Sequence, residues 1–372
     1  MSSSSREERL DWLRLARTGG VGPILFARLL QRYGSPARVL RDGARHLPEK
    51  VFARDRAALE MDTVEAAGGR LLMLEDEDYP AALRAIDDPP PVLGVLGDAD
   101  LLHHSCLAVV GARNASGNGR RLARHLAKGC GAAGLTIVSG LARGIDTAAH
   151  EGGLEAPSCT IAVIASGLDV AYPAENAELM RRIAECGAVV SERPWGSPPA
   201  AKHFPRRNRI IAGLSQGVLV VEAAEKSGSL MTARLALEQG REVMAVPGSP
   251  LDARHKGTNR LLRDGAALIE DVADVLAALP DRKPVAPGPR AERPPPGPPP
   301  APSVPSPNAG ERPADEMAGR LEELLGAAPL SVDELIRQCH ASPPLVQKAL
   351  LDLELEGRLV RHPGNRVSLE MG

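Results

Sequence analysis

Short apolar runs alternate with longer segments of helical spacing through the middle of the chain. The runs are rich in β-branched residues, which is typical of strands covered on both faces. Six of them are expected to be strands, at 107–110, 135–139, 160–164, 188–191, 218–222 and 242–246. The segments between them are rich in Ala and Leu and have the length of helices. This alternation predicts a mostly parallel, doubly wound α/β sheet.

Before this region, residues 8–67 have helical spacing with a Gly19-Gly20-Val21-Gly22-Pro23 break. A helix, a G-x-G-P turn and a second helix form the pattern of a helix-hairpin-helix unit, whose hairpin N–H groups can hold a backbone phosphate. The alternative is a small helical bundle used for packing or protein contact. Residues 68–105 are expected to be a connector with one strand, 92–97, at the edge of the sheet.

After the α/β region, residues 280–313 contain 14 prolines in 34 positions, which predicts an extended spacer. Residues 314–370 predict a winged helix, with helices over 317–325, from Ser331 and from Ser342, and a hairpin around 363–365. The third helix carries several acids, which opposes major-groove reading and favours protein contact or packing. The alternative role of the basic wing (Arg358, Arg361, Arg366) is a weak contact with phosphate.

The chain therefore divides into a helical module at 1–67, an α/β core at 68–279, a linker at 280–313 and a winged-helix domain at 314–372. Its 45 basic and 47 acidic residues nearly balance, so a site for a polyanion must be a local cluster. Five scattered cysteines without a C-x-x-C pair argue against a zinc site or disulfides and fit a reducing cytoplasm. No apolar run is long enough for a membrane helix, and no signal region is evident.

The candidate chemistry lies where the strands end. The first strand runs into Gly111-Ala112-Arg113 and then into a helix loosened by Gly117 and Gly119. A strand feeding a helix N-terminus presents free N–H groups and a positive dipole end, which favour a phosphate, and Arg113 adds a planar set of donors. The alternative is an ordinary turn with a surface arginine. The G-x-G-x-x-G and P-loop patterns are absent.

The other strand ends repeat this chemistry, because their loops carry Gly, small hydroxyl groups and a cation. Carboxyl ends of parallel strands share one edge of the sheet, so these loops predict a basic, Gly-lined groove. Residues 201–215 alone contain four Lys or Arg and no acid. The alternative for any one arginine is an ion pair with Asp146, Glu192 or Glu222.

These motifs together resemble the DprA/Smf family of DNA-processing proteins. The resemblance rests on VVGARNAS (109–116), IVSGLARGIDTAAHEGGL (137–154), GLDVAYPAENAEL (167–179), HFPRRNRIIAGLS (203–215), VVEAAEKSGSLMTARLALEQGREVMAVPG (220–248) and GTNRLLRDGA (257–266). It implies an extended Rossmann-like core that binds single-stranded DNA without sequence preference, a homodimer, and loading of the RecA recombinase during natural transformation. It implies neither an enzyme nor a cofactor.

In this interpretation Asp146, His150 and Glu222 order loops rather than catalyse. Family members often carry a lysine after Tyr-Pro, whereas Ala174 and Glu175 follow Tyr172-Pro173 here, which predicts a weaker contact. Low aromatic content, 2%, favours capture of the backbone over stacking, with Phe204 and Tyr172 as the candidate base platforms. The residues expected to bind nucleic acid are Gly111, Arg113, Ser116, Ser139, Gly140, Arg143, Lys202, Phe204, Arg206, Arg207, Asn208, Arg209, Gly228, Ser229, Thr232, Lys256 and Asn259.

Two other classes of protein are alternatives, and a third, a dehydrogenase, is excluded. A nucleotide-acting enzyme of the lysine-decarboxylase-like phosphoribohydrolase type shares Gly-rich loops, but its P-G-G-x-G-T-x-x-E signature is replaced here by Pro247-Gly248-Ser249-Pro250. A purely structural adaptor does not explain the density of Gly and cation loops. A dehydrogenase needs an acid at the end of the second strand, where Ser139 stands instead.

Overall fold

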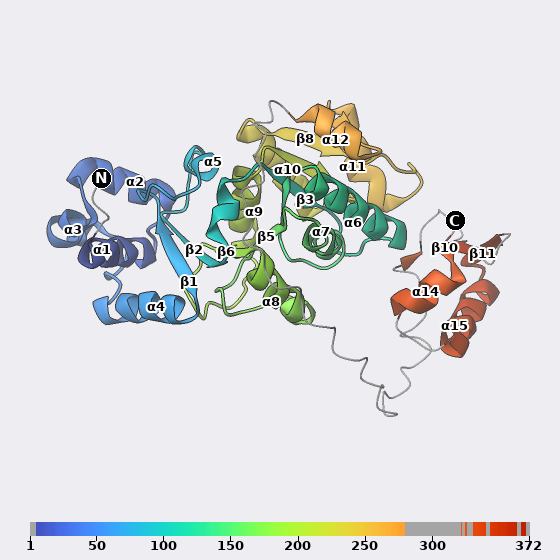
Figure 1. Ribbon diagram of the computed structural model, residues 1–372, viewed down its shortest axis with the longest axis horizontal. Coiled ribbons are helices and arrows are strands. Elements are labelled where there is room, and N and C mark those ends of the chain that lie inside the picture. Colours follow the sequence, from blue (N-terminus) through green and yellow to red (C-terminus); the bar gives the residue numbers. More distant parts are fainter. Residues whose placement is uncertain are drawn as a thin grey trace.

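The computed structural model describes residues 5–279, 321, 324–325, 330–339, 343–362 and 366–369. Along these residues a helical N-terminal module, a central α/β core and a winged-helix module follow one another (Figure 1). The linker at 280–313, most of the expected helix at 317–325 and the expected turn at 363–365 lie outside the described residues. Within the described part of the chain, no helix combines the length and apolarity needed to cross a bilayer.

A nine-stranded mixed sheet forms the core, in the order β1-β2-β6-β5-β4-β3-β7-β8-β9. The seven strands from β6 to β9 are parallel, whereas β2 runs antiparallel to β6 and β1 antiparallel to β2. The predicted doubly wound α/β fold is confirmed. The strands are β1 Gly69–Met73, β2 Val92–Gly97, β3 Cys106–Val110, β4 Thr136–Ser139, β5 Thr160–Val163, β6 Ala188–Ser191, β7 Gly217–Val220, β8 Glu242–Ala245 and β9 Ala267–Leu268.

The prediction that residues 92–97 form the edge strand was wrong. This strand, β2, is interior, because β1 pairs with it on the outside, from Gly69↔Leu96 to Met73↔Val92. Strand β9, whose two residues pair with β8 at the opposite edge, was not expected from the sequence either. Strand β1 was also not expected. Its antiparallel partner β2 begins some twenty residues later, so a run of only five residues gives little local pattern for a strand.

Helices cover both faces of the parallel strands. Leu126 of α6, Ala149 of α7 and Val275 of α12 pack on one face, and Ile211 of α9 and Ala233 of α10 pack on the other. Double coverage explains why all five residues of β3 are buried and apolar. The core helices are α5 Ala81–Arg84, η3 Ala99–His103, α6 Gly117–Ala132, α7 Ile145–Leu154, η4 Ala174–Asn176, α8 Ala177–Cys186, α9 His203–Leu214, α10 Gly228–Glu238, η5 Ala253–His255, α11 Lys256–Arg263 and α12 Val272–Ala278.

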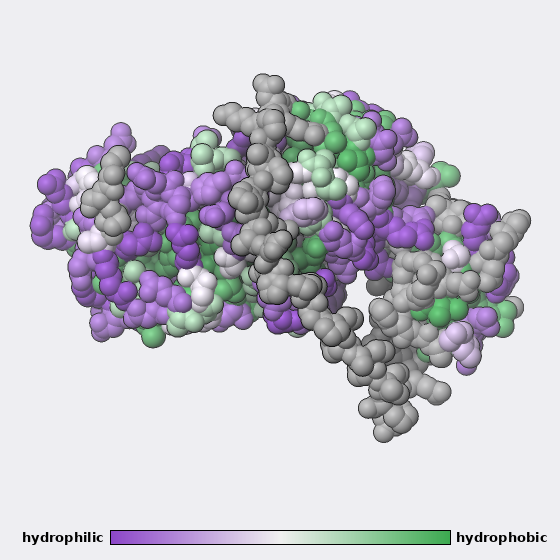
Figure 2. All heavy atoms as spheres, viewed as in Figure 1, coloured by the Kyte–Doolittle hydropathy of each residue, from purple (hydrophilic) through white to green (hydrophobic). Residues whose placement is uncertain are grey.

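The N-terminal module packs on the antiparallel end of the sheet. Leu13 and Phe26 share a hydrophobic cluster with Met73 of β1 and Val92 of β2. The indole N–H of Trp12 donates to the carbonyl of Pro91 at 2.7 Å. In the view of Figure 2 the surface of this module is largely hydrophilic, since most of its apolar side chains are buried in the cluster that its helices form with β1 and β2. Its helices are α1 Arg6–Arg17, α2 Pro23–Tyr33, α3 Pro36–Arg38, η1 Val39–Gly43, η2 Ala44–His46 and α4 Arg54–Ala66.

The C-terminal module contains the expected winged-helix elements. Strand β11 Leu359–His362 pairs antiparallel with β12 Arg366–Leu369, and β12 pairs in turn with β10 Leu330–Ser331. Helices α14 Val332–Cys339 and α15 Pro343–Leu355 pack on this small sheet through a separate hydrophobic cluster.

Candidate nucleic-acid interface

The order of the strands creates a crevice between β3 and β7. From β3 the chain moves through β4, β5 and β6 in one direction, and then returns to place β7, β8 and β9 on the other side of β3. Ligands of open α/β sheets bind at such a reversal, outside the carboxyl ends of the strands. Gly111 follows β3 at this point, and a Cβ there would lie 2.6 Å from Cγ1 of Ile145 and 2.9 Å from the carbonyl oxygen of Glu222. Only glycine fits this turn without a shift of its neighbours.

A hollow of about 770 Å³ opens at this reversal, between the carboxyl ends of the strands, α9 and the N-terminus of α10. We call it the switch-point groove. Eight of the residues predicted from the sequence line it: Gly111, Arg113, Phe204, Arg207, Asn208, Gly228, Ser229 and Thr232.

Arg113 supplies an exposed cation at the groove. Its guanidinium carbon lies 5.2 Å from the centre of the Phe204 ring, within range of a cation–π contact. The ring of Tyr172, 44% exposed, lies 5.6 Å from that of Phe204. In a chain with 2% aromatic residues, these two rings beside one arginine combine a phosphate donor with a surface on which a base can stack.

Arg207 provides a second, inner cation. Its side chain is buried at the groove wall, and Nη1 donates to the carbonyl of Val163 at 3.1 Å. Burial lowers the pKa of Arg207 to about 10 although the Asp146 carboxylate opposes this, so the guanidinium stays charged at neutral pH. A Cβ on Gly140 would lie 1.3 Å from Nη1, and this glycine therefore makes room for the guanidinium.

The loop after β4 is held by Asp146 and His150. Oδ2 of Asp146 accepts the N–H groups of Gly140 at 3.1 Å and Ala142 at 3.4 Å. Nε2 of His150 accepts the N–H of Leu141 at 3.2 Å. Burial lowers the pKa of His150 to about 3, so its ring is neutral. The N–H of Gly140, predicted to face a phosphate, is thus already occupied by a carboxylate.

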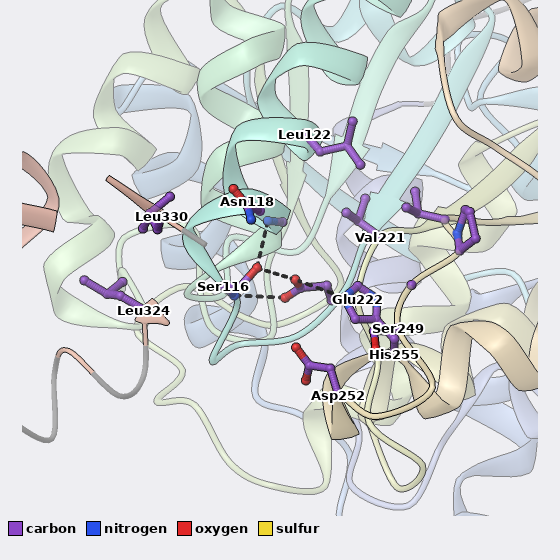
Figure 3. Close-up of a pocket in the computed structure, with 14 residues that line it drawn as sticks. Ser116, Asn118, Leu122, Val221, Glu222, Ser249, Asp252, His255, Leu324 and Leu330 are labelled. Carbon is purple, nitrogen blue, oxygen red and sulfur yellow. Dashed lines mark hydrogen bonds and ion pairs between the residues drawn. The ribbon is translucent and has the colours of Figure 1, made fainter. Parts of the chain in front are cut away.

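Glu222 holds the N-terminus of α6 (Figure 3). One carboxylate oxygen accepts the N–H of Ser116 at 2.9 Å and the other accepts its hydroxyl at 2.5 Å, while Ser116 Oγ accepts the N–H of Gly119. Ser116 is therefore the N-cap of α6 and lines a second pocket, of about 260 Å³, which we call the Glu222 pocket. Asp146, His150 and Glu222 all make the loop-ordering contacts expected from the sequence.

The remaining predicted residues do not line the groove. The Ser139 hydroxyl donates to the carbonyl of Val109, and the amide of Asn259 bonds both backbone groups of Gly248. Arg143 pairs with Glu175 at 2.7 Å, so this acid neutralises a neighbouring arginine. Lys202, Arg206 and Lys256 are exposed outside the groove lining.

Arg209 also lies elsewhere, because it is buried and paired with two acids. Its Nε lies 2.9 Å from Asp88 and its Nη2 lies 2.7 Å from Glu192. Conversely, the groove lining includes Lys226 and Arg254, which the predicted set omitted. Their signal in the sequence was their position in the loops that follow β7 and β8.

Replacing Arg209 with glutamine is expected to lower stability rather than binding. The change leaves two partly buried carboxylates without their cation, which costs about 2 kcal/mol. Thermal denaturation should show a Tm lower by roughly 4–8 °C. The affinity of the folded protein for single-stranded DNA should not change. Arg234→Gln, which breaks a surface pair with Glu238, is the matched control and should change neither quantity. An unchanged Tm together with much weaker binding of single-stranded DNA would mean that Arg209 belongs to the nucleic-acid interface.

The hairpin of the N-terminal module faces a carboxylate of its own chain. A Cβ on Gly19 would lie 1.9 Å from Oε2 of Glu49, and one on Gly20 would lie 2.6 Å from Cβ of Pro48. An acid over the hairpin repels a phosphate. The geometry therefore favours the packing alternative for this turn over the predicted phosphate contact.

The fold and the groove define a Rossmann-like protein with a helical module before its core and a winged helix after it. Family models described as "DprA-like N-terminal HHH domain", "DNA recombination-mediator protein A" and "DprA winged helix domain" match residues 6–67, 70–280 and 293–365. The chain belongs to the DprA/Smf family of DNA-processing proteins.

Relatives match the chain over most of its length. Protein Smf of Escherichia coli is 37% identical, with 96% of this chain and 91% of that protein covered. The X-ray structure of DprA from Streptococcus pneumoniae is 34% identical with a TM-score of 0.65, and the match covers 75% of this chain and 100% of that one. A structure of DprA from Helicobacter pylori, reported for its single-stranded DNA binding mode, is 31% identical with a TM-score of 0.52, covering 56% and 94%.

Proposed function

We propose that this protein binds single-stranded DNA in the switch-point groove, without reading its sequence. The observation that carries the proposal is the exposed Arg113, which contacts Phe204 in the same groove that Arg207 lines from within. The groove offers phosphate ligands and one stacking surface but no set of donors matched to particular bases. Membership of the DNA-processing family supports the same assignment, as does the relative from H. pylori whose structure was reported for its single-stranded DNA binding mode.

Binding, rather than chemistry, is the role we assign to this site. Asp146 and Glu222 accept backbone N–H groups, and His150 is buried and neutral, so each is committed to holding a loop. We propose no cofactor. Family membership further supports a homodimer that acts in the cytoplasm, protects incoming strands and passes them to the RecA recombinase in natural transformation. It also supports domain boundaries near residues 67, 279 and 313.

Fluorescence anisotropy with labelled oligo-dT and a duplex of equal length tests the proposal. We expect single strands to bind at least about 10-fold more tightly, because a groove lined by backbone turns excludes a duplex. If Arg113, Arg207 and Lys226 each neutralise one phosphate, raising salt from about 50 to 200 mM should weaken binding roughly 20-fold. Equal affinity for the duplex, or indifference to salt, would contradict the proposal.

A further inference from the structure

The winged-helix module contacts the core beside the groove. Arg254, in the short helix η5, donates from Nη2 to the carbonyl oxygen of Leu325 at 2.7 Å. The same guanidinium pairs with Asp252, Nη2 to Oδ2 at 3.0 Å, and both of these side chains are more than four-fifths buried. Arg254 therefore gives its donors to protein groups on both sides, although it lines the groove in which a phosphate would bind.

Apolar side chains join the same two parts of the chain at the Glu222 pocket (Figure 3). Leu324 and Leu330 of the winged-helix module line this pocket opposite Leu122 and Val221 of the core. A space of about 260 Å³, which polar residues such as Ser116 and Glu222 also line, remains in this pocket. The two parts of the chain therefore meet through a few apolar side chains and do not fill the pocket between them.

The wing itself reaches the groove. Leu369, the last residue of β12, is part of the groove lining, together with Arg113 and Phe204. An apolar side chain at this position adds no phosphate ligand and takes up room at the mouth. Single-stranded DNA that fills the groove therefore meets Leu369 and also Arg254, whose donors are already bonded to Leu325 and Asp252.

The charges of the module argue against an independent phosphate site on its wing. Arg361 pairs with Glu354 at 2.8 Å, and Arg358 pairs with Glu356 at 3.2 Å. The acids that the sequence shows at the end of α15 thus neutralise two of the three wing arginines. The module faces the core instead, which agrees with the protein-contact role expected from its acidic third helix.

We propose that the docked winged-helix module is an intramolecular competitor of single-stranded DNA for the groove. This inference rests on the proposed function. The 41 residues between Leu279 and Leu321 can reach up to about 140 Å, so the connection does not impose this position and the contacts select it. A tethered module has a high effective concentration, so even a loose contact stays populated. The apparent affinity for single-stranded DNA is then the intrinsic affinity multiplied by the fraction of molecules whose groove is open.

Arg254→Gln in the full-length protein gives a result of opposite sign for the two possible roles of this residue. If Arg254 holds the winged-helix module in place, the variant should bind oligo-dT about 3- to 10-fold more tightly although it has lost a positive charge. If Arg254 is simply a phosphate ligand, the variant should bind more weakly. Arg260→Gln on α11 removes an equally basic but exposed side chain outside the groove, and it should weaken binding slightly or not at all.

Leu122→Gln tests the docking contact from a residue outside the groove. It places an amide in the apolar side of the Glu222 pocket and should also tighten strand binding, with no change in the charge of the protein. In wild type, hydrogen exchange at Leu330–Ser331 and at the start of α6 should increase when oligo-dT is added.

The outcomes separate the two proposals. If wild type binds oligo-dT but Arg254→Gln weakens binding and Leu122→Gln leaves it unchanged, the competition is overturned while the strand-binding function stands. If wild type binds no strand at any salt concentration, the proposed function itself fails.

Discussion

Replacing Arg113 with glutamate is expected to weaken single-strand binding about 100-fold, or close to 3 kcal/mol. The arginine is the exposed cation of the groove that contacts Phe204, and no ion pair within the described part of the chain neutralises it. Charge-assisted bonds to a phosphate contribute about 1.5–3 kcal/mol each, and a carboxylate in the same place adds repulsion. Because the side chain is exposed, the fold should tolerate the change.

Anisotropy titration with oligo-dT at about 150 mM salt, where the Debye length is about 8 Å, measures this effect, and Arg182→Glu on α8 is the matched control. Arg182 is also exposed and gives the same change in net charge, but it lies outside the groove lining. The control should bind within about twofold of wild type, since exposed charges beyond a Debye length are screened. Equal losses in the two variants would mean that net charge, rather than the groove, determines binding.

Replacing Asp146 with asparagine is expected to destabilise the core by about 3 kcal/mol. The carboxylate is buried, accepts two N–H groups of the loop after β4, and its charge raises the pKa of Arg207. Burial raises the pKa of Asp146, whereas the nearby Arg207 lowers it. Asparagine keeps one acceptor but leaves Arg207 a buried cation without a counter-charge, and Tm should fall by roughly 6–12 °C.

A double variant separates the charge pair from the loop contacts. Arg207→Met in the Asp146→Asn background removes the unpaired cation and should recover part of the lost stability, as thermal denaturation would show. Glu178→Gln, at an exposed surface pair with Arg181, should leave Tm unchanged. If the double variant is no more stable than Asp146→Asn alone, the electrostatic interaction between Asp146 and Arg207 is not what holds this site together.

Local patterns in the sequence predicted most of the core. The runs at 107–110, 160–164 and 188–191 are strands in the structure to within a residue at either end, because a strand buried on both faces must be apolar throughout. Strand β1 escaped prediction, since its pairing with β2 depends on a partner and not on its own five residues. The same limitation applies to the two-residue β9.

The sequence predicted the correct edge of the sheet for the groove, but only about half of the residues it named line the groove. The segments that follow parallel strands must gather at one edge, so Arg113, Phe204 and Arg207 were found. Whether a cation remains available there depends on acids that the fold brings near. Asp88 lies 121 positions from Arg209 in the sequence, yet it pairs with the buried side chain of Arg209.

The sequence by itself determined the class of fold, the order of the modules and the family to which the chain belongs. These follow from periodicity and from local motifs, which are properties of neighbouring residues. Only the tertiary structure decided which arginines are neutralised, which N–H groups are occupied, and where the winged-helix module touches the core. These depend on distances between residues far apart in the chain, since ion pairs and hydrogen bonds act over only a few ångströms.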